Sequence, residues 1–372
     1  MWGLALEGGG TKGAYHVGVF RALRELNIPV KCVVGTSIGA VNGALFAQGD
    51  IDKLSELWHD ISISDIIALP EKVPQPHNIL DIRNIGMIIG EICRKKGLDI
   101  TPFEDLLHGI VDEGKIRNGT TLFGLATYCI SGKAEKQFFL NDIPEGMLVD
   151  YILASACFPG FQIRNIENNL YIDGGVANNL PVNMLIEQGC SDIISVEVGG
   201  FGITKKSGTA GCNVITVKCG EDIVGNLDFN HDGIMEMEKL GYYDALKAFG
   251  LCMGGRYSFH AVDYLLQKRR LSEGTIRGIE SAARYFGIDC MRIYKLSELA
   301  QLVIEHFHAA PVHNNIFEIL KWSDGEKAAC LARAILNSDA EVLNNKIIAG
   351  ILGEMFEAAS AVAYLERNIQ NI

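Results

Sequence analysis

The chain has 372 residues, of which 48% are hydrophobic and 21% are charged, and its formal net charge is −12. Its length and composition are those of a globular protein with room for one large domain or two. A chain this acidic is poorly suited to bind nucleic acid, which needs clustered Lys and Arg. Any transient contact with a membrane surface would depend on apolar burial.

The sequence opens on a predicted strand, with no basic or long apolar region of a secretory signal before it. No apolar run reaches the roughly 18 residues of a membrane-spanning helix. The ten cysteines are scattered singly, without C-x-x-C pairs or His residues at metal-ligand spacing. We therefore expect a cytoplasmic protein with reduced thiols, no metal and no cofactor.

The first predicted unit is a strand, a glycine loop and a helix. Residues 2–6 are an apolar strand, Glu7–Gly13 reads EGGGTKG, and residues 14–26 carry apolar side chains at helical spacing. Consecutive glycines let main-chain N–H groups turn toward one point, and the following helix adds its dipole. This loop is therefore suited to form an oxyanion hole from Gly8, Gly9 and Gly10. Lys12 either supports the loop or faces solvent.

The same loop also matches the G-x-G-x-x-G fingerprint of dinucleotide-binding enzymes, through Gly8, Gly10 and Gly13. Such a site needs Asp or Glu at the end of the second strand to hold the ribose hydroxyls. The second predicted strand, residues 31–34, instead runs into Gly35-Thr36-Ser37. A dinucleotide-dependent oxidoreductase is therefore a remote alternative.

The second predicted unit carries a candidate nucleophile. Residues 35–39 read GTSIG, a G-x-S-x-G pattern between an apolar strand and a run of small residues that predicts a helix over 40–47. Small residues, here Gly35 and Gly39, allow the tight turn that such an elbow requires, and the turn holds the Ser37 hydroxyl clear of the chain. Two adjacent parallel strands would bring Ser37 and the glycine loop to the same sheet edge.

Between residues 52 and 112 the pattern loosens. Prolines at 70, 74 and 76 predict a loop, and residues 79–92 place four isoleucines on one helical face before Arg94-Lys95-Lys96. This predicted helix is either a lid or membrane-contacting element, or a core-facing helix whose basic end suits the helix dipole.

The next segments predict an α/β region with a candidate base. We expect strands over 120–130, 136–140, 192–198 and 213–217, and helices over 147–156, from Pro181 to about 188, and over 233–249. Asp173 ends a short strand and is followed at once by Gly174-Gly175, so its carboxylate would sit on a tight turn. From about 255 onward the pattern is nearly all helical, with segments over 299–307, 316–322, 328–336 and 347–365.

Together these motifs resemble those of the patatin-like phospholipase family. The resemblance rests on the segments 8–13 (GGGTKG), 35–39 (GTSIG) and 173–175 (DGG), with weaker matches around Ala154-Ser155, Asn178-Asn179 and Gly241-Tyr242. It covers about residues 1–250. It implies a three-layer α/β/α sandwich with a mostly parallel central sheet over 1–250, and leaves residues 251–372 as a helical accessory region.

The resemblance also implies an activity, a lipid acyl hydrolase with a Ser37–Asp173 dyad. Gly8, Gly9 and Gly10 would form the oxyanion hole, supported by Lys12, Gly13, Gly35, Gly39, Gly174 and Gly175. The histidines downstream of Asp173 stand in no glycine turn or comparable setting, so a Ser-His-acid triad is the weaker hypothesis. Acyl transfer to an alcohol or thiol shares the same acyl-enzyme and stays open. A non-catalytic binding module is disfavoured because all three motifs are intact.

Overall fold

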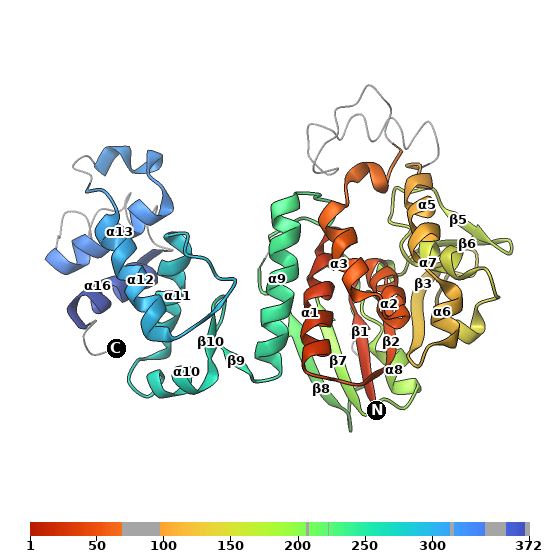
Figure 1. Cartoon of the computed structure of the whole chain (residues 1–372). Coiled ribbons are helices and arrows are strands. Elements are labelled where there is room, and N and C mark those ends of the chain that lie inside the picture. The colour runs from red at the N-terminus through yellow and green to blue at the C-terminus, as the bar shows by residue number, and fades with distance from the viewer. Residues whose placement is uncertain (69–96, 206–207, 222, 313–315, 339–354, 369–372) are drawn as a thin grey trace. The chain divides into compact units, whose positions relative to one another are not determined.

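The computed structural model describes residues 1–68, 97–205, 208–221, 223–312, 316–338 and 355–368 (Figure 1). The chain forms two compact units, Met1–Ala248 and Phe249–Ile372. The proline loop and the helix expected over 79–92 lie outside the described residues. No helix within the described ranges is both long and apolar enough to cross a membrane.

The first unit is built on one eight-stranded sheet in the order β5-β6-β3-β2-β1-β7-β8, with β4 paired to β3. Strands β1, β2, β3, β7 and β8 are mutually parallel, while β4, β5 and β6 run antiparallel to their neighbours. The strand bounds are β1 Trp2–Leu6, β2 Val30–Thr36, β3 Leu122–Cys129, β4 Ala134–Phe139, β5 Arg164–Ile166, β6 Asn169–Asp173, β7 Asp192–Glu197 and β8 Asn213–Lys218.

Helices cover both faces of this sheet, because successive strand residues point to opposite sides. On one face, Leu6, Val33 and Phe123 surround the backbone of α2 at Gly43. On the other, Ala5 and Val34 pack with Met184 and Leu185 of α8. The helices are α1 Ala14–Glu25, α2 Ile38–Gln48, α3 Ile51–Asp60, α5 Thr101–Ile110, α6 Glu113–Asn118, α7 Leu148–Ser155, α8 Val182–Glu187 and α9 His231–Ala248. The predicted α/β/α architecture with a mostly parallel sheet is confirmed.

The first unit also contains four short 3-10 turns within the described residues. They are η1 Gly10–Gly13, η2 Ile63–Asp65, η3 Leu140–Asp142 and η4 Gly174–Val176. Both η1 and η4 follow strands of the central sheet, and both contain glycines that the motifs singled out. Pro181 serves as the N-cap of α8 rather than standing inside its first turn.

The second unit is mainly helical, as expected, but it also contains a small sheet that the sequence did not predict. Strands β9 Cys252–Met253, β10 Ser258–His260 and β11 Ile293–Tyr294 pair in the order β11-β10-β9. Two or three residues are too short to show the alternation that identifies a strand. The helices are α10 Ala261–Gln267, α11 Glu273–Tyr285, α12 Leu296–Ala309, α13 Asp324–Asn337 and α16 Phe356–Asn368, with η5 at Ile316–Lys321.

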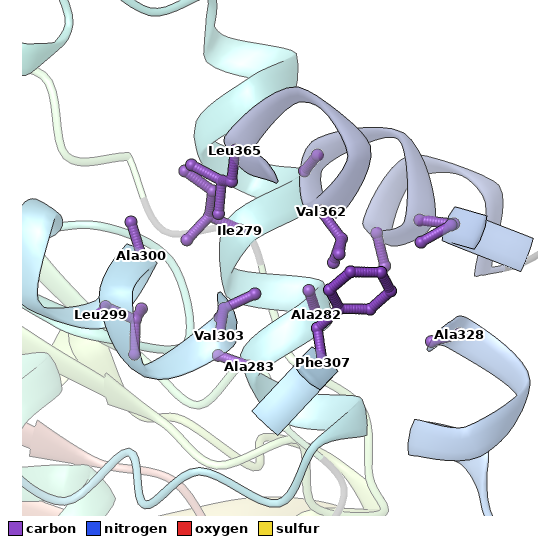
Figure 2. Packing of buried hydrophobic residues seen from close by; sticks show 14 of the residues in the cluster. Ile279, Ala282, Ala283, Leu299, Ala300, Val303, Phe307, Ala328, Val362 and Leu365 are labelled. Atoms are coloured by element: carbon purple, nitrogen blue, oxygen red, sulfur yellow. The ribbon is translucent and has the colours of Figure 1, made fainter. Parts of the chain in front are cut away.

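The core of the second unit lies among α11, α12, α13 and α16 (Figure 2). Small side chains such as Ala282 and Ala328 alternate in it with larger ones such as Phe307 and Leu365. Ser323 begins α13 with a capping box, accepting from the N–H of Glu326, whose carboxylate accepts from the N–H of Ser323. The predicted helix over 347–365 begins outside the described residues, and α16 extends beyond its predicted end.

Candidate active site

The serine of the G-x-S-x-G segment stands on a strained turn between β2 and α2. Ser37 is the N-cap of α2 and has φ 56° and ψ −126°, a backbone conformation that non-glycine residues rarely adopt. The turn is tight, because a Cβ atom on Gly35 would lie 2.2 Å from the carbonyl of Gly39. These features are those of a nucleophile elbow, and they hold the Ser37 side chain at the positive end of α2.

The hydroxyl of Ser155, which the sequence placed only among the weaker motif matches, fixes the backbone of this elbow. The Ser37 N–H donates to Ser155 Oγ at 2.9 Å, and Ser155 Oγ donates to the carbonyl of Ala126 at 2.6 Å. Ser155 is fully buried at the end of α7. It therefore ties the serine backbone to strand β3, and the Ala-Ser segment at 154–155 was the available signal for this role.

The glycine loop lies beside the elbow at the same carboxyl edge of the sheet, as expected for parallel neighbours β1 and β2. Gly10 has φ 56°, and a Cβ atom there would lie 1.8 Å from the carbonyl of Asn226. The Gly8 N–H donates to the carbonyl of Asn179 at 3.0 Å. No acceptor for the N–H groups of Gly9 and Gly10 occurs within the described part of the chain. Gly8 was expected to be an oxyanion donor, but its N–H is already hydrogen-bonded to Asn179. The N–H groups of Gly9 and Gly10 remain available for that role.

Lys12 and Glu7 brace this loop from inside the protein. Lys12 is buried, and its Nζ donates to the carbonyl of Gly199 at 3.0 Å, so it supports the loop rather than facing solvent. The buried Glu7 carboxylate accepts from the N–H groups of Val198 and Gly199 at 2.6 and 2.9 Å. Burial raises the pKa of Glu7, against the lowering effect of these hydrogen bonds. Glu7 carries no sequence motif that marks it for this role, because an acidic residue at the end of a strand is usually exposed.

Gly13 and Gly174 fill tightly packed positions nearby. Gly13 is the N-cap of α1, and its carbonyl accepts from Asn42 Nδ2 at 2.8 Å. Gly174 opens η4 directly after Asp173, where a Cβ atom would lie 2.3 Å from the carbonyl of Ala126. Gly13 therefore contributes a main-chain carbonyl, and Gly174 allows close approach to β3 because it has no side chain.

Asp173 ends β6, and its carboxylate is almost fully buried. Its Oδ1 accepts from the N–H of Gly175 at 2.7 Å, which holds the carboxylate on the turn. Burial raises the pKa of Asp173 to about 6, with hydrogen bonds from the Ser37 side chain and the Gly175 N–H acting in the opposite direction. The structure thus brings together the serine and the carboxylate that are 136 positions apart in the sequence (173 − 37).

Ser37, Asp173 and the three glycines line a single cavity of about 310 Å³. The remaining lining is mostly apolar and comes from α2, α3, α5, and the loops around 158–161, 201 and 227–229. Its larger apolar members are Ile38, Val41, Leu57, Trp58, Ile61, Ile66, Phe103, Leu106, Leu107, Ile110, Phe158, Phe161, Phe201, Leu227 and Phe229. A volume at the lower end of ligand pockets, with few polar groups beside the serine, suits an apolar chain attached to a reactive group.

No histidine is among the described residues that line this cavity. His16 is fully buried, and burial lowers its pKa to about 3, so it is neutral. His59 contacts Glu238 at 3.1 Å on α9, in a separate cluster. The described ranges also hold no group of three or more His, Cys, Asp or Glu positioned for a metal, and no disulfide joins the nine cysteines within them.

The fold and this arrangement define the class: an α/β protein that carries a serine on a strand–turn–helix elbow. Residues 4–186 match the family model described as patatin-like phospholipase. The chain is 30% identical over 202 residues to patatin-like phospholipase domain-containing protein ZK370.4 of Caenorhabditis elegans. It is 27% identical over 203 residues to lysophospholipase NTE1 of Kluyveromyces lactis.

These matches cover 54% and 53% of this chain but only 14% and 12% of the two relatives, so the chain spans a small part of their length. Among solved structures, VipD from Legionella pneumophila aligns over 97% of this chain and 89% of its own, with a TM-score of 0.45 and 13% identity. Over residues 4–186 this chain is therefore similar to the patatin-like phospholipase family.

Proposed function

We propose that the chain is a serine acyl hydrolase that cleaves carboxylic esters of lipids through a Ser37–Asp173 dyad. The observation that carries the proposal is that Ser37, Asp173 and the N–H-bearing turn at Gly9 and Gly10 line one apolar cavity. The family name and the printed name of NTE1, a lysophospholipase, support lipid esters as the substrate class. Residues 1–250 would form the catalytic domain, and residues 251–372 an accessory region.

In the first step Ser37 Oγ attacks the ester carbonyl while its proton passes to the Asp173 carboxylate. The tetrahedral intermediate places its oxyanion toward the N–H groups of Gly9 and Gly10, with the α2 dipole adding to the field. A preformed donor of this kind contributes on the order of 3 kcal/mol to transition-state stabilisation. Collapse of the intermediate expels the alcohol, which takes the proton from Asp173, and leaves the acyl group on Ser37.

In the second step water attacks the acyl-enzyme and Asp173 accepts its proton. The tetrahedral intermediate then collapses, Ser37 Oγ takes the proton from Asp173, and the fatty acid leaves. The raised pKa of Asp173, about 6, suits this role, because the group is mainly ionised at neutral pH yet basic enough to accept a proton. Replacing water by an alcohol or thiol would turn the same intermediate into an acyltransferase reaction, which is the alternative function.

The test is hydrolysis by the full chain of dissolved short esters, lysophospholipids and phospholipid vesicles. Ser37→Ala and Asp173→Asn should each lower turnover by about 10²- to 10⁴-fold while the circular dichroism spectrum is unchanged. A fluorophosphonate should label the wild type at Ser37 and leave Ser37→Ala unlabelled. Ser64→Ala, an exposed serine outside the cavity lining, is the matched control. Full activity in either dyad variant would refute the assignment.

A further inference from the structure

Two large apolar side chains stand exposed on the segment that follows β7. Phe201 is 69% exposed and Ile203 is 57% exposed. Phe201 also lines the cavity that contains Ser37, so apolar surface continues from the cavity to the outside of the catalytic unit at this point. Isolated exposed apolar residues are ordinary, but two on one short segment at the entrance to a site are not.

Hydrogen bonds fix the backbone of this segment to the active-site turns. The Ile203 N–H donates to the carbonyl of Gly175 at 2.8 Å, and the Asn179 N–H donates to the carbonyl of Ile203 at 2.7 Å. Lys205 forms an ion pair with Glu135 of β4 beyond it. The segment therefore moves as part of the turn that carries Asp173 rather than as a free loop.

Close packing also prevents the segment from folding inward to bury its apolar side chains. A Cβ atom on Gly200 would lie 1.8 Å from the carbonyl of Gly8, so the backbone already touches the glycine loop. Phe201 is thus presented outward from a rigid support. Burial of these two side chains requires something other than this segment to cover them.

We propose that Phe201 and Ile203 are the lipid-contacting edge of the catalytic unit, inserting into the apolar zone of a membrane or micelle surface. The choice of lipid as occupant rests on the proposed function and on the continuity of Phe201 with the apolar cavity. A lipid acyl chain leaving the bilayer beside Phe201 enters the cavity without crossing water. The chain's net charge of −12 points to a zwitterionic surface, since an anionic one would repel it.

The binding test removes catalysis and asks only for partitioning. The full chain carrying Ser37→Ala is mixed with vesicles of ether-linked phosphatidylcholine, which cannot be hydrolysed at an ester, and the bound fraction is measured by flotation. Adding Phe201→Ser or Ile203→Ser should weaken partitioning about tenfold or more for each buried side chain lost. Val214→Ser is the matched control, because Val214 is 37% exposed near the start of β8, and the cavity lies at the carboxyl edge of the sheet.

A second measurement separates this surface from the chemistry. With Ser37 intact, Ile203→Ser should lose hydrolysis of vesicle lipid in step with its binding and keep hydrolysis of a dissolved short ester, because Ile203 does not line the cavity. Vesicle binding that survives both substitutions, or that is absent in the parent chain, overturns the proposal. So does concentration-dependent dimerisation abolished by the same substitutions, since the occupant is then a second copy. If the wild-type chain has no esterase activity but its vesicle binding is weakened by these substitutions as expected, the lipid-contact proposal stands and the proposed hydrolase function is refuted.

Discussion

Gly8 and Asn179 hold each other through two hydrogen bonds. The Gly8 N–H donates to the carbonyl of Asn179 at 3.0 Å, and Asn179 Nδ2 donates to the carbonyl of Gly8 at 3.0 Å. The Asn179 side chain also lies 3.4 Å from Glu7 Oε1. This one residue joins the glycine loop to the turn that follows Asp173, so it sets the distance between the proposed oxyanion donors and the proposed base.

Asn179→Ala should therefore lower kcat more than it changes KM. The substitution removes the Nδ2 donor to Gly8 and leaves the buried carbonyl without that partner, which loosens the loop. Misplacement of donors by a fraction of an ångström costs catalysis steeply, and we expect a loss of about 10- to 100-fold in kcat on a dissolved ester. Steady-state kinetics on a short ester give both constants.

Asn183→Ala is the control for this experiment. Asn183 also donates through its Nδ2 atom, to Gln137 at 3.0 Å, but it lies on α8 outside the cavity lining. Its kinetics should stay within about twofold of the wild type. Equal losses in the two variants would show that Asn179 acts through general stability, and no loss in Asn179→Ala would remove its positioning role.

The raised pKa of Asp173 predicts an acidic limb in the pH profile. The dyad needs the ionised carboxylate to accept the Ser37 proton, and burial raises the pKa of Asp173 to about 6. The sign follows directly: kcat/KM should be full above this value and fall about tenfold per pH unit below it. An ordinary exposed aspartate would place the same limb near pH 4.

Glu7 is the group to exclude in that titration, since burial raises its pKa too. Glu7→Gln keeps a side chain of the same shape and removes the ionisation. The limb should persist near pH 6 in this variant even where its overall rate is lower. A limb that disappears with Glu7→Gln would assign the titration to Glu7 and leave Asp173 without support as the base.

Gly10 and Gly49 form a matched pair for testing the glycine loop. Both have positive φ, 56° and 84°, but a Cβ atom on Gly10 would lie 1.8 Å from the Asn226 carbonyl, while one on Gly49 meets nothing within 4 Å. Gly49→Ala should cost only the left-handed strain, about 1–2 kcal/mol, and keep its activity. Gly10→Ala should lower the thermal midpoint further and abolish turnover, because the loop must shift. Similar midpoints and activities in the two variants would contradict this reading of the loop.

Much of the fold was predictable because its strands are short apolar runs punctuated by glycine. The strand predicted over residues 2–6 is β1 with the same bounds, and the strand predicted over residues 31–34 lies within β2. Both could be predicted because burial on both faces of a parallel sheet requires a continuous run of apolar residues. Strand β5, of three residues, and the small sheet β9–β11 gave no such signal. Their formation depends on tertiary contacts and not on a local pattern of apolar residues.

The candidate site was predictable where a motif is local, and was not where it depends on packing. Ser37 and its flanking glycines predict a tight turn, because the whole motif lies within five consecutive residues. The bond from the Ser37 N–H to Ser155, and the bracing of the loop by Glu7, join segments more than a hundred positions apart and leave no periodic trace in the sequence. The use of the Gly8 N–H by Asn179, which corrects its expected role, is of the same kind.

The cavity walls predict how acyl-chain length can be altered. Leu57 of α3 is half-buried and lines the cavity, so a larger side chain there should reduce the 310 Å³ available to substrate while leaving Ser37 and Asp173 unchanged. Leu57→Trp should therefore shift preference toward shorter acyl chains. We expect kcat/KM for a long-chain ester to fall about tenfold or more and that for an acetyl ester to change little.

Leu170→Trp is the matched control for that substitution, since Leu170 is 39% exposed on β6 and does not line the cavity. The measurement is kcat/KM across a series of esters that differ only in acyl length. The ratio of long-chain to acetyl ester should fall in Leu57→Trp and stay constant in Leu170→Trp. An unchanged ratio in both would mean that the acyl chain does not occupy this cavity, whereas parallel losses for every ester would point to a damaged fold.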